Sequence, residues 1–201
     1  MKAIETVYAG TTFRSRLEAT WACMFDMLGW TWAHEPFDLD GYIPDFVLGF
    51  YKDVLVEVKP ATSEDDLKLQ AVAKIVASGW DKEALIVGVL PLYMDEDSIF
   101  PGHRRLGVLG QVIPETDTLS WGWGLAHGCT ECGRFSMYHD FMTFNCRVTG
   151  CYAGDHFLGG PEPDLAAMWG EAQRIVRWEP GKRAKVSKAR RDLFPSIRRE
   201  T

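Results

Sequence analysis

The sequence lacks the long apolar segments that mark membrane and secreted proteins. None of its apolar runs approaches the roughly 18 residues that a membrane-spanning helix requires. The N-terminal stretch, MKAIETVYAGTTFRSRLEA, has no apolar core of the signal-peptide kind. The sequence also lacks internal repeats. We therefore expect a globular protein that stays away from the membrane and resides in the cytoplasm, which would be the host cytoplasm if a phage encodes it.

Cysteine is scarce, and its odd count of 5 without a secretion signal argues against a disulfide framework. Cys23 stands apart in an apolar stretch and is expected to be a small core residue. The other four form C-x₂-C and C-x₄-C pairs, a pattern typical of structural Zn²⁺ held by four thiolates. These four are Cys129, Cys132, Cys146 and Cys151. Disulfides and an iron–sulfur cluster are the alternatives, and a histidine could replace one cysteine: His127, His139 or His156.

The chain also lacks an overall positive charge, since its formal net charge is −6. The charge is unevenly distributed, however, because residues 174–201 hold ten Lys/Arg and three Asp/Glu. A basic arm on an acidic body is typical of a polyanion-binding tail, and equally of a solvated terminus. The candidates for contacting DNA phosphates in this tail are Lys182, Arg183, Lys185, Lys188, Arg190 and Arg191.

Hydrophobic periodicity predicts an α/β (α+β) fold in which helices cover a mixed sheet. The expected elements are a helix over 15–28, strands over 30–35, 42–48 and 54–59, a helix over 63–79, and strands over 84–90 and 106–113. From about residue 119 the composition shifts to Gly, aromatics, Cys and His with poor periodicity, which favours a separate small module. A last amphipathic helix is expected over 163–178.

Acidic residues converge on the predicted hairpin of the second and third strands. Alternate strand residues share a face, so Glu57 and Lys59 are expected to point the same way. A turn between the strands would bring Asp45 near Glu57. Two carboxylates this close together repel each other, and in proteins a bound divalent cation commonly offsets this repulsion. The pair could therefore hold one or two Mg²⁺ (or Mn²⁺) ions, with the carbonyl of Val58 as a further ligand.

Three segments carry a resemblance to a known family: FRSRLEA (13–19), YIPDF (42–46) and VEVKP (56–60). They resemble the PD-(D/E)XK nuclease superfamily, especially small phage-type and transposon-end-cleaving nucleases. The resemblance covers about the first 90 residues and implies a restriction-endonuclease-like αβββαβ core. It implies metal binding by Glu18, Asp45 and Glu57, with Lys59 assisting catalysis. It also places Gln70 near the site or the DNA.

The resemblance, the cysteine spacing and the charge distribution together suggest three parts: a nuclease core over 1–115, a Cys₄ zinc-ribbon module over 116–160, and a C-terminal helix with basic tail over 161–201. The implied function is Mg²⁺-dependent DNA endonuclease activity on branched, recombination or replication intermediates, and a homodimer would suit cleavage of two strands. The alternatives are a recombination exonuclease, or a non-catalytic zinc-dependent DNA-binding adaptor. In the blander interpretation Glu18 only caps its helix, Asp45 is a turn residue, and Glu57 and Lys59 form an exposed ion pair on an edge strand.

Overall fold

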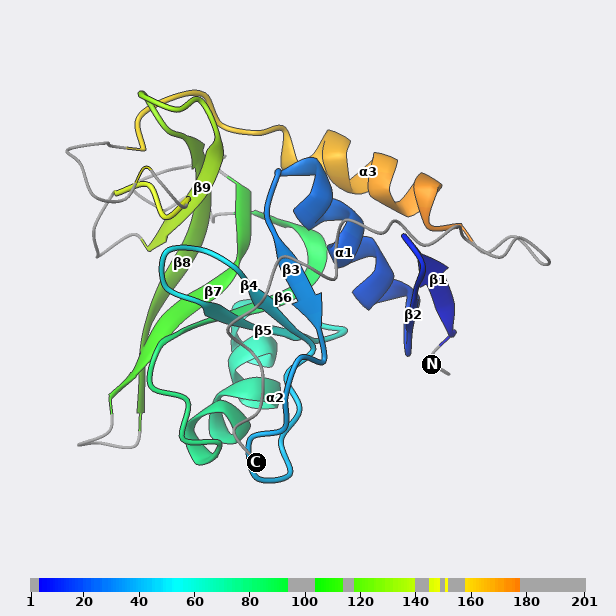
Figure 1. Ribbon diagram of the computed structural model, residues 1–201, viewed down its shortest axis with the longest axis vertical. Helices are drawn as coiled ribbons and strands as arrows, with labels where there is room; N and C mark the ends of the chain where they lie inside the picture. Colours follow the sequence, from blue (N-terminus) through cyan, green and yellow to red (C-terminus); the bar gives the residue numbers. More distant parts are fainter. Residues whose placement is uncertain are drawn as a thin grey trace.

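A seven-stranded mixed sheet forms the centre of the molecule (Figure 1). The computed structural model describes residues 4–93, 104–113, 118–139, 145–148, 151 and 158–177. The seven strands of this sheet follow one another in chain order. They are β3 (Trp32–His34), β4 (Phe46–Leu48), β5 (Val54–Val58), β6 (Glu83–Tyr93), β7 (Arg104–Ile113), β8 (Thr118–Gly128) and β9 (Phe135–His139). Neighbouring strands are antiparallel except for β5 and β6, which are parallel. The fold is therefore mixed α+β, as the periodicity predicts.

The first helix, α1 (Arg16–Met27), begins and ends where the sequence predicts. The Ser15 hydroxyl accepts the backbone N–H of Glu18 and donates to Glu18 Oε1 at 2.8 Å, which satisfies an otherwise unpaired amide of the first turn. Gly29, at φ 73°, ends the helix in the left-handed conformation that glycine adopts without strain. A two-stranded hairpin, β1 (Thr6–Tyr8) and β2 (Thr11–Phe13), precedes α1 and was not predicted.

The hairpin of β4 and β5 is confirmed, although β4 is shorter than predicted. Residues 42–45, expected to open the strand, lie outside β4, and Tyr42 instead pairs with Leu39 in an isolated bridge. Pro44 lacks a backbone N–H and so cannot donate to a ladder hydrogen bond, which accounts for the late start of the strand. All three residues of β4 and all five of β5 are buried.

Helix α2 (Glu64–Ala77) connects the parallel strands β5 and β6, so these three elements form a βαβ crossover. Ser63 caps α2 by accepting the backbone N–H of Asp66, as the capping-box pattern predicts. The order helix, three strands, helix, strand predicted for the first 90 residues is therefore present as α1, β3–β5, α2 and β6.

Residues 118–139 extend this sheet rather than form a sheet of their own. Strand β8 pairs with β7, and β9 pairs with β8, both antiparallel. The expected boundary at 115/116 thus falls between two hydrogen-bonded strands. In β8 each Trp is followed by a Gly, and Gly124 lies against Leu85, where an added Cβ would come within 3.1 Å of the Leu85 side chain. The glycines that obscured the strand in the sequence allow the close packing of its buried face.

The three helices cover the sheet on two sides (Figure 1). Helix α3 (Leu165–Ile175) lies beside α1, where Trp21 and Trp169 are 5.4 Å apart between ring centroids. The Trp21 indole N–H also donates to the carbonyl of Gly88 in β6 at 2.8 Å, which fixes α1 to the sheet. Helix α2 lies apart from this pair, with strands between them. Among the described residues, no helix is long and apolar enough to cross a membrane.

Candidate functional site: a carboxylate pocket and a four-cysteine cluster

Strand register brings the predicted acidic residues together. Phe46 pairs with Val56 in the β4–β5 hairpin, so the next position along places Asp45 opposite Glu57. His34 pairs with Phe46 on the other side of β4, which brings β3 to the same end of the hairpin. The sheet therefore gathers side chains from three consecutive strands at one end.

Glu57 is buried, and both of its carboxylate oxygens have partners. Oε1 accepts a hydrogen bond from the ammonium group of Lys59, which confirms that these two side chains share a face. Oε2 accepts the hydroxyl of Tyr42 at 2.8 Å. Burial, followed by the negative charge of Glu57, raises the pKa of Tyr42, so this hydroxyl stays protonated and acts as a donor. The blander interpretation of an exposed ion pair on an edge strand is wrong, because β5 is an interior strand and Glu57 is only 4% exposed.

Asp45 is also buried, at 6% exposure, and bridges the hairpin to the segment before α1. Its Oδ2 accepts the backbone N–H of Val58 at 2.8 Å, and its Oδ1 accepts Arg14 at 2.8 Å. Burial, then repulsion from Glu57, raises the pKa of Asp45 to about 6, against the opposing effects of the Val58 amide and Lys59. Burial and the charge of Glu57 therefore disfavour the charged form of Asp45, and a further cation in the site would favour it.

Arg14 supplies positive charge to the pocket from the solvent side. Its guanidinium contacts Asp45 and also Glu35 Oε1 at 3.0 Å, while its side chain remains 62% exposed. Glu35 adopts a positive φ of 45°, an unfavourable conformation for a non-glycine residue, and its backbone N–H donates to the carbonyl of Asp45 at 3.1 Å. Such strained residues are common at functional sites.

Glu18 reaches the same region from α1. Its Oε1 accepts Ser15, whereas its Oε2 lies 3.5 Å from Nε2 of His34. Burial raises the pKa of Glu18, but His34, Ser15 and Arg14 together outweigh burial and hold it below its ordinary value. Glu18 is thus a helix cap, and in addition presents a buried carboxylate oxygen toward β3.

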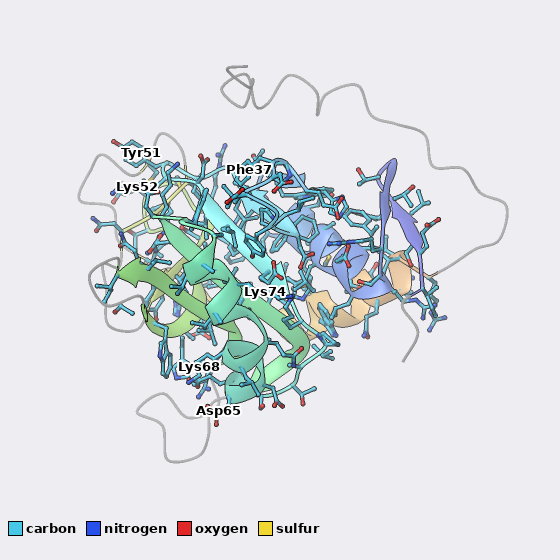
Figure 2. All side chains as sticks on the ribbon, turned by 90° about the horizontal axis from the view of Figure 1, so that it is seen from below. Phe37, Tyr51, Lys52, Asp65, Lys68 and Lys74 are labelled. Atoms are coloured by element: carbon cyan, nitrogen blue, oxygen red, sulfur yellow. The ribbon has the colours of Figure 1, made fainter. Side chains whose placement is uncertain are left out.

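An open pocket of about 580 Å³ lies over Asp45 and Glu57. Cationic side chains at its wall come from three separate segments: Arg14, Lys59 and Lys74. Figure 2 shows Lys74 toward the C-terminal end of α2, whereas Asp65 and Lys68 lie toward its start. The pocket therefore combines two buried carboxylates and Asp40 with three cationic side chains, a combination suited to a metal ion and a phosphate.

The predicted DNA contact Gln70 is exposed on α2 but does not line this pocket. Lys74, one helical turn later, does. Sequence reasoning missed Arg14, Tyr42, His34 and Lys74. Arg14 stands next to the capping serine within the segment FRSRLEA, which is the one signal that could have marked it. The six basic tail residues from Lys182 to Arg191 lie outside the described residues.

The four cysteines converge on one point. All four Sγ atoms lie within 4.8 Å of one another. Within the described part of the chain, this is the one group that brings together three or more ligand atoms of Cys, His, Asp or Glu. Cys129 and Cys151 are 3.4 Å apart, and Cys132 and Cys146 are 3.9 Å apart. These separations exceed a disulfide bond of about 2.0 Å. They are close to the roughly 3.8 Å expected between thiolates bound tetrahedrally to one ion at about 2.3 Å.

The turn from Cys129 to Gly133 is shaped to present thiolates. Gly133, at φ 67°, donates its backbone N–H to the carbonyl of Cys129 at 3.0 Å. Burial raises the pKa of Cys129, but backbone N–H groups of Cys132 and Glu131 outweigh burial and hold it at about 7. His127 is not part of the cluster, because its ring contacts the Tyr138 hydroxyl at 3.3 Å and Glu162 at 3.4 Å.

Arg147 ties the cysteine cluster to the sheet. Its guanidinium forms two hydrogen bonds to Glu83 of β6, at 2.9 and 2.7 Å, and its backbone N–H donates to the Ser136 hydroxyl of β9. Its carbonyl accepts the backbone N–H of Tyr51, in the turn between β4 and β5. Arg147 follows Cys146 directly, so any ligand of the cysteines would also stabilise these contacts.

Comparisons with protein-family models, with curated protein sequences and with solved structures each gave no match. The function is therefore inferred from the geometry of the pocket and from the residues that form it.

Proposed function

We propose that the protein is a metal-dependent nuclease that hydrolyses phosphodiester bonds in DNA. The observation that carries this proposal is the convergence of Asp45, Glu57 and Lys59 at one end of the β4–β5 hairpin, under an open pocket with positively charged walls. The spacing of these residues is the one expected from the resemblance to PD-(D/E)XK nucleases.

The residues fit a hard divalent cation. Asp45 and Glu57 are buried carboxylates, and burial beside Glu57 raises the pKa of Asp45 even though Arg14 contacts it. Together with the carbonyl of Val58 they would hold Mg²⁺, whose remaining ligands are commonly waters. When bound, such an ion lowers the pKa of a ligand water and offsets charge on the scissile phosphate. Two carboxylates and a carbonyl are enough protein ligands for such an ion. The site therefore needs no third Cys, His, Asp or Glu side chain, and the four cysteines remain the one close group of three or more of these residues in the described part of the chain.

The protein's own cations would complete the chemistry. Lys59 contacts Glu57 and is placed to orient the attacking water or to donate to a phosphate oxygen. Arg14 is largely exposed and can leave Asp45 to contact the phosphate backbone. Tyr42 donates to Glu57 and thereby fixes the orientation of that carboxylate. The surrounding positive charge makes a polyanionic substrate the natural choice.

We assign DNA as the partner, with branched or recombination intermediates as the preferred substrate and a homodimer as the cutting unit. The basic segment over 182–191 would add phosphate contacts that position the substrate without specifying sequence. For the cysteine cluster we propose one structural Zn²⁺, because its four thiolates leave no open position for catalysis.

The decisive experiment is cleavage of supercoiled plasmid, a four-way junction and a single strand, each with Mg²⁺ and with EDTA. We expect Mg²⁺-dependent cutting that Asp45→Ala abolishes. Asp65→Ala is the matched control, since this carboxylate is exposed on α2 and should leave cleavage intact. Degradation of linear but not circular DNA would instead indicate an exonuclease. Binding of DNA without any metal-dependent cleavage would overturn the proposal in favour of a zinc-dependent adaptor.

A further inference from the structure

The three cations that line the pocket differ in whether a carboxylate engages them. Arg14 contacts Asp45, and Lys59 contacts Glu57. Lys74 also lines the pocket, yet within the described part of the chain no carboxylate forms an ion pair with its ammonium group. The charge of Lys74 is therefore available to an anion that enters the pocket.

The course of α2 directs Lys74 to the pocket rather than to the sheet. Leu67, Ala71 and Ile75 recur at intervals of four residues and are buried, so they form the face that packs on the sheet. Lys74 precedes Ile75 in the last turn of the helix, and Ala77, three residues later, lines the same pocket. A cation in this turn also offsets the partial negative charge of the helix end. That purely structural role is the alternative to binding an anion.

Two other lysines show what distinguishes Lys74. Lys68, on the same helix, contacts Glu64 at 2.6 Å and lies 3.5 Å from the Trp121 centroid, so its charge is already engaged. Lys52 has no ion pair among the described residues, but it lies in the turn between β4 and β5 and does not line the pocket (Figure 2). Of these three lysines, Lys74 is the one that combines an unengaged charge with a position on the pocket wall.

The size of the pocket and its charges indicate where a DNA strand would run. Its volume of about 580 Å³ lies within the roughly 300–1,000 Å³ of sites that enclose a small-molecule ligand, so it has room for more than one phosphate group. Besides Lys74, the charged lining residue that has no ion pair with the described residues is Asp40, in the 39–42 turn. Asp40 repels a phosphate and Lys74 attracts one, which favours a backbone path along α2.

We propose that Lys74 binds a phosphate next to the scissile one and thereby positions the DNA strand over Asp45 and Glu57. This inference rests on the proposed nuclease function, because it assigns a substrate contact to the same pocket. Lys74 is a positioning residue, which takes no part in bond cleavage and binds its phosphate equally in the ground state and in the transition state. Such uniform binding lowers KM and leaves kcat unchanged.

The test is binding of the zinc-loaded full chain to a fluorescent four-way junction without added Mg²⁺, over a series of salt concentrations. Lys74→Gln should bind roughly fivefold more weakly at low salt, the upper end for an exposed ion pair. The slope of log K against the logarithm of the salt concentration should become shallower by roughly 0.9, the value for one phosphate contact. Lys74→Arg should restore both quantities. Lys52→Gln, which removes an unengaged lysine outside the pocket, should change neither.

A second measurement locates the phosphate. Once the cut made with Mg²⁺ has been mapped, each phosphate that flanks it is replaced in turn by an uncharged methylphosphonate. One of these replacements should weaken binding by the wild type but have no further effect on Lys74→Gln, because that contact is already lost. In cleavage assays Lys74→Gln should raise KM about fivefold and keep kcat within about twofold of the wild type.

The possible results separate this inference from the proposed function. If Lys74→Gln unfolds at a lower temperature but keeps the wild-type salt slope, Lys74 serves only the helix end, and the phosphate contact is wrong while the nuclease proposal stands. An equal loss of binding in Lys52→Gln would indicate general surface attraction and would also overturn the contact. If the wild type shows the Lys74-dependent slope but cuts no DNA, the contact stands and the nuclease proposal fails. If the wild type binds no DNA, both fail.

Discussion

Asp45 has the least favourable electrostatic setting among the pocket residues. Its pKa rises from an ordinary 3.8 to about 6 because it is buried beside Glu57. A raised carboxyl pKa means that the folded state binds the proton more tightly, so the stabilising effect of protonation is present below pH 4 and lost by pH 6 and above. Asp45 therefore reduces the free energy of unfolding of the metal-free pocket at neutral pH.

The unfavourable charge of Asp45 predicts that Asp45→Asn is more stable than the wild type. The comparison uses protein that contains zinc but to which no other divalent metal has been added. A neutral amide avoids repulsion from Glu57, so the free energy of unfolding should exceed that of the wild type by on the order of 2–3 kcal/mol at about pH 7.5. The gain should be nearly absent at about pH 4. Denaturant unfolding at the two pH values measures it, and an equal effect at both would contradict the assignment of strain to the charge of Asp45.

In the proposed metal site, Arg14 would compete with the ion for the Asp45 carboxylate. It donates to Asp45 Oδ1 at 2.8 Å from a mostly exposed side chain. Arg14→Gln should therefore strengthen Mg²⁺ binding several-fold in the absence of DNA, because a positive charge leaves the pocket. Calorimetry measures this, with Arg16→Gln as the neighbouring exposed control. Weaker Mg²⁺ binding in Arg14→Gln would show that Arg14 organises the site instead.

The sequence could reveal the residues that regular structure positions, but not those that irregular backbone positions. Strand alternation and the hairpin were enough to place Glu57 beside Lys59 and Asp45 near Glu57, and the capping box was enough to place Glu18 on α1. Tyr42 reaches Glu57 only because residues 39–42 make a tight turn in which Asp40 has φ 53°. No periodicity describes such a turn.

At the level of elements, the cysteine turns and strands β8 and β9 depend on one another. The backbone N–H of Cys129 donates to the carbonyl of Arg134, just before β9, and Cys146 precedes the arginine that contacts β6. We expect the wild type to hold about one Zn²⁺ ion per chain and Cys146→Ser to lose it. The variant should also unfold at a markedly lower temperature. Elemental analysis and calorimetry measure both quantities.

Cys23→Ser is the matched control for this prediction. Cys23 is buried in α1 and belongs to no cluster among the described residues, so its substitution should leave the zinc content unchanged. Zinc retained at full occupancy in Cys146→Ser would contradict a four-thiolate site.

Strand β8 shows why the sequence did not predict the strands between residue 118 and residue 139, although it did predict helix α3. Trp121 and Trp123 alternate with Gly122 and Gly124, which is the two-residue period of a strand, but glycine is an unfavourable strand residue and hid the pattern. Cations lie over both indoles: Lys68 of α2 lies 3.5 Å from the Trp121 centroid, and the buried Arg105 of β7 lies 3.2 Å from that of Trp123. These contacts join distant segments and could not be inferred from local sequence.

For the whole molecule, the pair of buried Arg147 and partly exposed Glu83 is a polar link between the cysteine cluster and the sheet. Arg147→Ala should lower the free energy of unfolding by about 3 kcal/mol, because it leaves the Glu83 carboxylate without its partner. The double variant Arg147→Ala/Glu83→Ala should recover part of that loss. Denaturant unfolding of the four proteins measures the coupling, and simple additivity would mean that the pair contributes little.

The uneven charge of the chain leads to a prediction about DNA binding as a whole. Replacing the six basic tail residues with glutamine should make the slope of log K against the logarithm of the salt concentration shallower by up to about 5. This corresponds to roughly 0.9 for each phosphate that is no longer neutralised. The six are Lys182, Arg183, Lys185, Lys188, Arg190 and Arg191. Binding measured over a salt series tests this, and an unchanged slope would identify the tail as a solvated terminus.

The sequential order of strands β3 to β9 bears on how the chain folds during synthesis. Each strand hydrogen-bonds to the one made just before it, so every new strand can add to an edge that already exists. The connections from β4 to β5, from β7 to β8 and from β8 to β9 are short, which keeps the entropic cost of these additions low. The carboxylate pocket belongs to the first strands to emerge, whereas the last cysteine of the cluster follows β9. The chain can therefore form the carboxylate pocket early, whereas the four cysteines can come together only after the last strand of the sheet has been made.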